Sequence, residues 1–191
     1  MKRGNFIYEG KAKTIYEVEG QPELVWQEFK NSLTAFNGLK KGDFDNKGEL
    51  NRKITSRLFH YLTEKKIANH WVADIDKNIM VTQRLKIIPI EVVMRNKVAG
   101  GLAKKFGWEE GKALETPLVE FYYKSDTLND PFISDEQALL LKAATIPQMA
   151  ELKRQGLIVN KELIGFFSQI GLDLIDFKLE FGINHKGEII L

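Results

Sequence analysis

The chain has 191 residues, of which 43% are hydrophobic and 28% are charged, a composition typical of a globular protein rather than a disordered one. The net charge of +2 argues against wholesale wrapping of nucleic acid. The absence of cysteine excludes disulfides, thiolate metal sites and cysteine nucleophiles. Because the apolar runs are too short to span a membrane and the first residues lack a signal-peptide core, we expect a cytoplasmic protein without a membrane partner.

The first half of the chain is expected to form strands around one helix. Aromatic and β-branched runs predict strands at residues 6–9, 14–18 and 24–29, and a hairpin turn at residues 10–13 joins the first two. Asn37-Gly38 indicates a turn. One helix face over about 48–66 is predicted by apolar residues at every fourth position, namely Leu50, Ile54, Leu58 and Leu62. Two more strands are expected at 71–73 and 79–82.

The second half mixes strands and helices. Residues 87–94 predict an apolar strand that ends at residues 96–101, followed by a short helix at 102–106 and a strand at 118–123. A Ser134/Gln137 capping box predicts a helix over 135–144, and a second helical pattern covers 146–170. Strands at 172–181 and 188–191, joined by a turn, complete an α+β fold of mostly antiparallel sheets with packed helices. A division near residue 85 would give two parts, 1–85 and 86–191.

The strand predicted at 172–181 separates charged from apolar side chains. Side chains alternate across a strand, so Asp176, Lys178 and Glu180 share one face with Leu174, while Ile175, Phe177, Leu179 and Phe181 share the other. The apolar face indicates core. The charged face would suit a cation, a phosphate and a substrate ammonium in one cleft, but a solvated face with mutually compensating charges is the more common meaning of such a row.

Two basic segments would suit anions. In the stretch 90–95, Glu91, Val93 and Arg95 share one face of the strand. Arg95 ends this stretch beside Gly100-Gly101, where backbone N–H groups are accessible to a phosphate or carboxylate. Lys11 and Lys13 lie on the predicted hairpin, where they would cover nucleotide phosphates. An ordinary glycine turn and a basic surface turn are the alternatives. The P-loop, dinucleotide-binding and zinc-protease motifs are absent from the sequence.

The same segments together resemble the SAICAR synthetase family of purine biosynthesis. The resemblance is carried by residues 8–16 (YEGKAKTIY), 87–101 (IIPIEVVMRNKVAGG) and 174–182 (LIDFKLEFG), with support from residues 34–38 and 124–131. It implies a two-part α+β architecture of antiparallel sheets with packed helices. Residues 1–85 would form a kinase-lobe-like part that binds ATP, and residues 86–191 would form a substrate and metal-binding part.

The resemblance also implies an activity. Family members are carbon–nitrogen ligases that use ATP and Mg²⁺ to join L-aspartate to carboxyaminoimidazole ribonucleotide. The substrate carboxylate takes the γ-phosphoryl group to form an acyl phosphate, and the aspartate amine then displaces phosphate. Such chemistry needs positioning and charge neutralisation more than covalent help from the protein. A homodimer is a candidate assembly.

The resemblance assigns roles residue by residue. Nucleotide-binding positions are Lys11, Ala12 and Lys13 over the phosphates, Gln83, Leu85 and Ile87 in a connecting segment at adenine, and Glu180 as the magnesium ligand. Catalytic positions are Asp176 and Lys178. Positions for the imidazole nucleotide are Arg95, Ala99, Gly100 and Gly101, and Lys124 and Asp130 belong to the region that receives substrate. Recognition of aspartate stays open between Lys124, Asp130 and Lys178, and Lys178 would act either as a charge stabiliser or in proton transfer.

Two departures from the family pattern affect these expectations. Gly101 stands where the family commonly has serine, so a hydroxyl donor to substrate is missing. The family also continues beyond the position of Leu191 with an acidic strand-end motif, which leads us to expect a C-terminally incomplete chain that is a poor enzyme. A non-catalytic nucleotide-binding module is therefore the alternative to a ligase.

Overall fold

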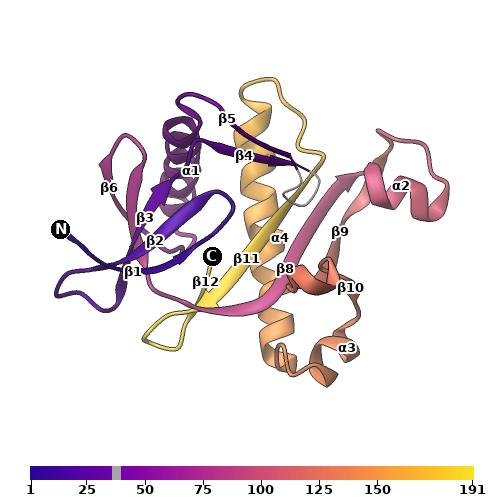
Figure 1. The fold of residues 1–191 in the computed structure, drawn as a ribbon. Helices are drawn as coiled ribbons and strands as arrows, with labels where there is room; N and C mark the ends of the chain where they lie inside the picture. Colours follow the sequence, from indigo (N-terminus) through magenta and orange to yellow (C-terminus); the bar gives the residue numbers. More distant parts are fainter. Residues whose placement is uncertain (36–39) are drawn as a thin grey trace. The chain divides into compact units, whose positions relative to one another are not determined.

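The computed structural model describes residues 1–35 and 40–191, so the predicted Asn37-Gly38 turn lies outside the described residues (Figure 1). The Cα positions divide the chain into two compact units. The first comprises Met1–Leu85 with Asn184–Glu188, and the second comprises Lys86–Ile183 with Ile189–Leu191.

A five-stranded antiparallel sheet with the order β1-β2-β3-β7-β6 forms the first unit. Its strands are β1 (Arg3–Glu9), β2 (Lys13–Val18), β3 (Leu24–Phe29), β6 (Trp71–Asp76) and β7 (Ile79–Gln83). The predicted hairpin is confirmed, because β1 pairs with β2. Two short strands that the sequence analysis did not predict, β4 (Ser32–Ala35) and β5 (Lys40–Asp43), form a separate two-stranded sheet.

Helix α1 (Lys47–Glu64) confirms the predicted helix but only the end of its predicted apolar face. Leu62 is buried, whereas Leu50 and Ile54 are 50% and 59% exposed. The other buried positions are Gly48, Ser56 and Tyr61. A polar contact explains this orientation. Asp74 of β6 accepts hydrogen bonds from Ser56 Oγ at 2.6 Å and from the Arg52 guanidinium at 2.7 Å. These bonds turn the Arg52/Ser56 face of α1 toward the sheet.

The second unit has its own five-stranded antiparallel sheet, in the order β10-β9-β8-β11-β12. Its strands are β8 (Lys86–Lys97), β9 (Ala113–Tyr123), β10 (Phe132–Ile133), β11 (Asp176–Ile183) and β12 (Ile189–Ile190). Strand β8 continues three residues beyond the predicted end at Met94, and β9 begins five residues before the predicted start at Leu118. Strand β11 begins only at Asp176, so residues 172–175 are not part of it.

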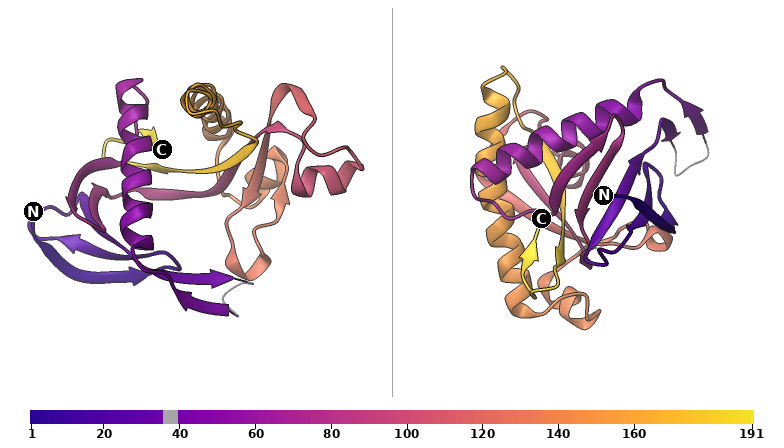
Figure 2. Two further views of the ribbon diagram at one scale, coloured as in Figure 1. Left: turned by 90° about the horizontal axis from the view of Figure 1, so that it is seen from above. Right: turned by 90° about the vertical axis from the view of Figure 1, so that its left-hand side faces the viewer.

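The α-helices of the second unit follow the predicted order, as α2 (Gly100–Phe106), α3 (Asp135–Leu140) and α4 (Ile146–Ser168). The 3-10 helix η1 (Asp126–Leu128) was not predicted. The Ser134/Gln137 capping box is confirmed, although α3 ends four residues before the predicted residue 144. Helix α4 lies along one face of the sheet, as Figure 2 shows.

Packing against α4 defines the core side of this sheet. Gly156 lies so close to β8 that a Cβ atom on it would be 3.1 Å from Met94 Sδ and 3.3 Å from Val92 Cγ1. Fully buried residues on the strands include Ile90, Val92, Met94 and Phe181. Because side chains alternate, the residues between them on β8 and β11 lie on the opposite face of the sheet.

Candidate active site

The β1–β2 hairpin of the first unit is held at its base by Lys30. The Lys30 ammonium forms an ion pair with Glu9 and donates to the Gly10 carbonyl at 3.2 Å. The Lys30 N–H donates to the Ala12 carbonyl at 2.9 Å. Lys13 Nζ lies 5.1 Å from the centre of the Phe29 ring. The turn that carries Lys11, Ala12 and Lys13, which the sequence analysis assigned to the ATP phosphates, is thus held by several contacts with Lys30.

The connecting segment after β7 presents its backbone. Gln83 ends β7 and its N–H donates to the His70 carbonyl at 2.7 Å. Leu85 follows in the short connection to β8, and within residues 1–35 and 40–191 its N–H and carbonyl have no hydrogen-bond partner. Ile87 is the second residue of β8 and is exposed. Backbone groups without a partner are the type of group that reads the edge of a nucleobase.

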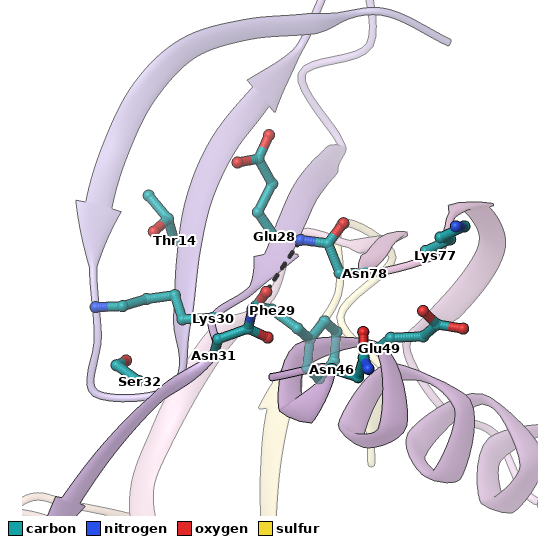
Figure 3. A pocket seen from close by; sticks show the side chains of 10 residues that line it. All are labelled: Thr14, Glu28, Phe29, Lys30, Asn31, Ser32, Asn46, Glu49, Lys77 and Asn78. Atoms are coloured by element: carbon teal, nitrogen blue, oxygen red, sulfur yellow. Dashed lines mark hydrogen bonds between the residues drawn. The ribbon is translucent and has the colours of Figure 1, made fainter. Parts of the chain in front are cut away.

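A polar hollow of about 550 Å³ lies elsewhere in the first unit (Figure 3). It is bounded by the end of β3, the start of α1 and the β6–β7 turn, and Asn78 Nδ2 donates to the Phe29 carbonyl at its wall at 3.1 Å. The described residues that line it include none of the predicted site residues. Three charged side chains of its described lining form ion pairs, namely Glu28 with Arg3, Lys30 with Glu9 and Glu49 with Lys53.

The second unit carries a charged face on three neighbouring strands, which we call the polar face. It consists of Glu91 and Arg95 of β8, Glu120 and Tyr122 of β9, Asp176, Lys178 and Glu180 of β11, and Lys124 directly after β9. Strand register brings these residues together: Glu180 pairs with Glu91 and Asp176 with Arg95, while Glu91 pairs with Tyr122. The predicted grouping of Asp176, Lys178 and Glu180 on one face is confirmed by this register.

Charges on the polar face compensate across strands rather than along one strand. Arg95 forms ion pairs with Glu120 and Asp176, each at 2.7 Å. Lys178 forms an ion pair with Glu91, and Lys124 forms one with Glu180 at 2.9 Å. The sequence analysis gave mutually compensating charges as the more common explanation of the charged row at Asp176, Lys178 and Glu180. The structure shows such compensation together with burial, since the side chains of Glu91 and Glu120 are only 7% and 8% exposed.

Lys124 remains an ammonium in these surroundings. Partial burial acts to lower its pKa, but the hydrogen bond to Glu180 and the charges of Glu180 and Glu91 raise the pKa above its ordinary value. Asp130 contributes in the same direction. The Asp130 carboxylate also accepts a hydrogen bond from the Ser125 N–H at 2.7 Å, so it closes its own turn. Asp130 therefore lies close enough to Lys124 for its charge to act on that ammonium group.

The loop after β8 leads into α2. Ala99 is the N-cap of α2, and Gly100 has a φ of 52°, a conformation that favours glycine. The Gly100 N–H donates to the Glu110 carboxylate at 3.0 Å. A Cβ atom on Gly101 would have nothing within 4 Å. The space for a serine side chain is thus present at position 101, although the hydroxyl is not.

Comparison with known proteins decides the family. A model of the SAICAR synthetase family matches residues 6–191. A phosphoribosylaminoimidazole-succinocarboxamide synthase of Halalkalibacterium halodurans is 47% identical over 191 residues, which are 100% of this chain and 80% of that protein. The chain belongs to the SAICAR synthetase family.

Solved structures of SAICAR synthetases agree with this assignment. The synthase of Ehrlichia chaffeensis matches with a TM-score of 0.91 and 37% identity, over 98% of this chain and 80% of that one. A SAICAR synthetase in complex with ADP also matches with a TM-score of 0.91 and 38% identity, over 96% of this chain and 78% of that one. The predicted resemblance and the predicted α+β fold are confirmed.

Sequence reasoning missed three residues of the polar face. Glu91 was placed on the same side of its strand as Arg95 but given no role, and Glu120 and Tyr122 were not considered as site residues. Alternation along one strand identifies which side chains share a face. It does not give the register between strands that are distant in sequence, and register is what places Glu120 beside Arg95.

The described residues contain no group of three or more histidine, aspartate or glutamate side chains arranged to hold a metal ion. Among the helices of residues 1–35 and 40–191, none has the length and apolar character needed to cross a membrane.

Proposed function

We propose roles for the residues of this chain in the reaction of its family. The chain is an ATP-dependent ligase of purine biosynthesis that forms SAICAR. The observation that supports the roles most strongly is the polar face, where two buried carboxylates hold an arginine and two lysines in place. A preorganised set of charges is what phosphoryl and acyl transfer require of a protein.

The reaction joins two substrates, carboxyaminoimidazole ribonucleotide and L-aspartate. Attack of the substrate carboxylate on the γ-phosphorus of ATP breaks the bond to ADP and gives an acyl phosphate. Attack of the aspartate amine on the acyl carbon then forms the amide and releases phosphate, with loss of the ammonium protons. Both steps concentrate negative charge, so cations near the reacting groups stabilise the transition states.

The nucleotide roles fall to residues of both units. Lys11 and Lys13 neutralise the phosphates, supported by the Lys30 contacts at the base of their turn. The backbone of residues 83–87 contacts adenine, for which the unpartnered N–H and carbonyl of Leu85 are suited. Glu180 is the carboxylate of the polar face that we assign to the magnesium ion.

The residues proposed for the nucleotide offer one carboxylate ligand to Mg²⁺, that of Glu180. Mg²⁺ is usually bound by one or two carboxylates together with substrate phosphates and water, and Glu180 offers a partly exposed carboxylate whose partner is Lys124. When bound, the ion supplies charge neutralisation at the phosphates. The scarcity of clustered carboxylates means that most of its ligands would come from the nucleotide and water.

The substrate roles belong to the second unit. Arg95 and the Ala99–Gly101 loop bind anionic groups of the imidazole nucleotide. Lys178 and Asp176 lie on β11 next to Arg95 and Glu91 and contact the reacting groups. Lys124, kept protonated by Glu180 and Glu91, binds a carboxylate of L-aspartate.

Release of ADP tests this function. The chain is assayed with MgATP, carboxyaminoimidazole ribonucleotide and L-aspartate, and each component is omitted in turn. We expect ADP only when all are present. The alternative of a non-catalytic nucleotide-binding module is not favoured by the relatives, which are named synthases. ATP binding without turnover would restore this alternative. ADP release that is independent of aspartate would contradict amide formation.

A further inference from the structure

Arg95 has two carboxylate partners in different surroundings. Its Nε donates to Glu120 and its NH1 donates to Asp176, both at 2.7 Å. The side chain of Glu120 is 8% exposed, whereas that of Asp176 is 39% exposed. Glu120 is therefore a buried partner, and Asp176 is one that solvent and ligands reach.

A second donor fixes Glu120. The Tyr122 hydroxyl donates at 3.1 Å to Oε2, the oxygen that also accepts from Arg95. Burial raises the pKa of Tyr122, so the hydroxyl keeps its proton and stays a donor at neutral pH. A buried carboxylate that accepts two hydrogen bonds at one oxygen has few alternative positions, because leaving either donor would leave a buried charge underpaired.

Strand register accounts for the arrangement. Val93 pairs with Glu120 and Arg95 pairs with Leu118, so Glu120 is a diagonal neighbour of Arg95 on the same face. Tyr122 lies two residues further along β9 and faces the same way. The three side chains thus belong to two paired strands of one sheet, not to a loop.

We propose that Glu120 is a positioning residue for the imidazole nucleotide, acting through Arg95. A guanidinium has five N–H donors, and the bond to Glu120 uses only the one at Nε. Holding Nε in place fixes the plane of the guanidinium and leaves the terminal nitrogens for an anion that replaces Asp176. This inference rests on the proposed role of Arg95 in binding carboxyaminoimidazole ribonucleotide.

Steady-state kinetics of three single variants test the proposal. Glu120→Gln keeps the shape of the side chain but removes the charge that holds Arg95. We expect its KM for carboxyaminoimidazole ribonucleotide to rise about tenfold, while its KM for ATP stays within about twofold. Tyr122→Phe removes one donor to Glu120 and should raise the same KM by about two- to threefold. Glu115→Gln, an exposed carboxylate on the same strand, is the matched control and should change neither constant.

A double-mutant cycle separates positioning from a general structural effect. Arg95→Lys removes the fork that Glu120 holds, so adding Glu120→Gln to it should change the nucleotide KM by less than about twofold. Full additivity of the two substitutions would overturn the inference and leave the role of Arg95 standing. An unchanged nucleotide KM in Arg95→Lys would overturn the proposed role of Arg95 itself. If Glu120→Gln does not fold, as judged by circular dichroism, the same cycle with Tyr122→Phe decides the question.

Discussion

At the scale of single residues, Glu91 is the centre of the charges on one half of the polar face. It forms an ion pair with Lys178 of β11, and Lys124 Nζ lies 4.0 Å from the same carboxylate oxygen. Its side chain is 7% exposed, while those of Lys178 and Lys124 are 48% and 42% exposed. Glu91 thus anchors two ammonium groups from beneath while leaving them accessible to ligands.

Lys178→Met tests this half of the face. The substitution keeps most of the aliphatic stem and removes the cation closest to Glu91. We expect kcat for SAICAR formation to fall by about 10²-fold or more, the scale seen when a group that stabilises developing charge is removed. Lys161→Met, at an exposed position of α4, serves as the control and should keep normal activity. Unchanged turnover in Lys178→Met would show that the assignment of Lys178 to the reacting centre is wrong.

The sequence predicts the part of the candidate site that depends on the alternation of side chains along a strand. The charged sides of residues 90–95 and 176–180 followed from period-two patterning, and the strand register confirms them. Pairing partners did not follow, because a strand pattern contains no information about which distant strand lies next to it. The roles of the individual residues, including Lys11, Glu180 and Asp130, stay predictions.

At the scale of elements, two helical glycines occupy opposite environments. A Cβ on Gly48, near the start of α1, would lie 2.5 Å from the Phe29 carbonyl oxygen of β3. A Cβ on Gly165, near the end of α4, would have nothing within 4 Å. Close approach of α1 to β3 therefore depends on glycine at position 48, whereas position 165 only loses helix propensity by being glycine.

Alanine at each position should have opposite effects on stability. Gly48→Ala forces α1 away from a backbone atom that cannot yield easily, and we expect the free energy of unfolding to fall by about 1–3 kcal/mol. Gly165→Ala should raise it by about 0.5–1 kcal/mol, since alanine is the better helix former. Urea unfolding followed by circular dichroism gives both values. A neutral or stabilising Gly48→Ala would mean that α1 is not held against β3 at this point.

Elements with a clear periodic pattern were predicted well, and the strands that were missed are short. The strand at residues 24–29 coincides with β3. Strand β10 has two residues and β4 and β5 have four each, too few to show a period. The apolar stripe at Leu50 and Ile54 was misleading because the bonds from Ser56 and Arg52 to Asp74, a tertiary contact, set the rotation of α1.

At the scale of the whole molecule, His70 links folding to pH. Its ring packs 4.8 Å from the Phe59 ring. Although the residue is partly exposed, the Nε2 atom is buried and has no hydrogen-bond partner among the described residues. Burial, helped by the charge of Lys13, lowers the pKa of His70 from 6.5 to about 4. The folded protein therefore holds this imidazole neutral at pH values where the unfolded chain protonates it.

Stability should fall as the pH is lowered through this window. The unfolded chain binds a proton near pH 6.5 and the folded protein only near pH 4, so the contribution is complete above pH 6.5 and is lost by pH 4. At about 1.4 kcal/mol per pKa unit, the loss amounts to at most about 3.5 kcal/mol. Urea unfolding from pH 4 to pH 7 measures it. His70→Gln should remove this part of the slope and His185→Gln, in an exposed turn, should not; identical slopes in all three proteins would contradict the burial argument.

The distance in sequence between residues of the polar face also limits when the candidate site can form during translation. Arg95 and Asp176, which form one of its ion pairs, are 81 positions apart in the chain. A nascent chain must therefore complete β9, α3 and α4 before β8 meets its partner β11. Contacts between such distant segments form slowly, because the entropy of closing the intervening loop is lost before any pairing energy is gained. Until then Glu91 and Arg95 lie on an unpaired strand edge, the type of edge that associates with other chains. Translation of this ligase thus has an interval, ending only with residues 176–183, in which the β8 edge that later pairs with β11 is open to association with other chains.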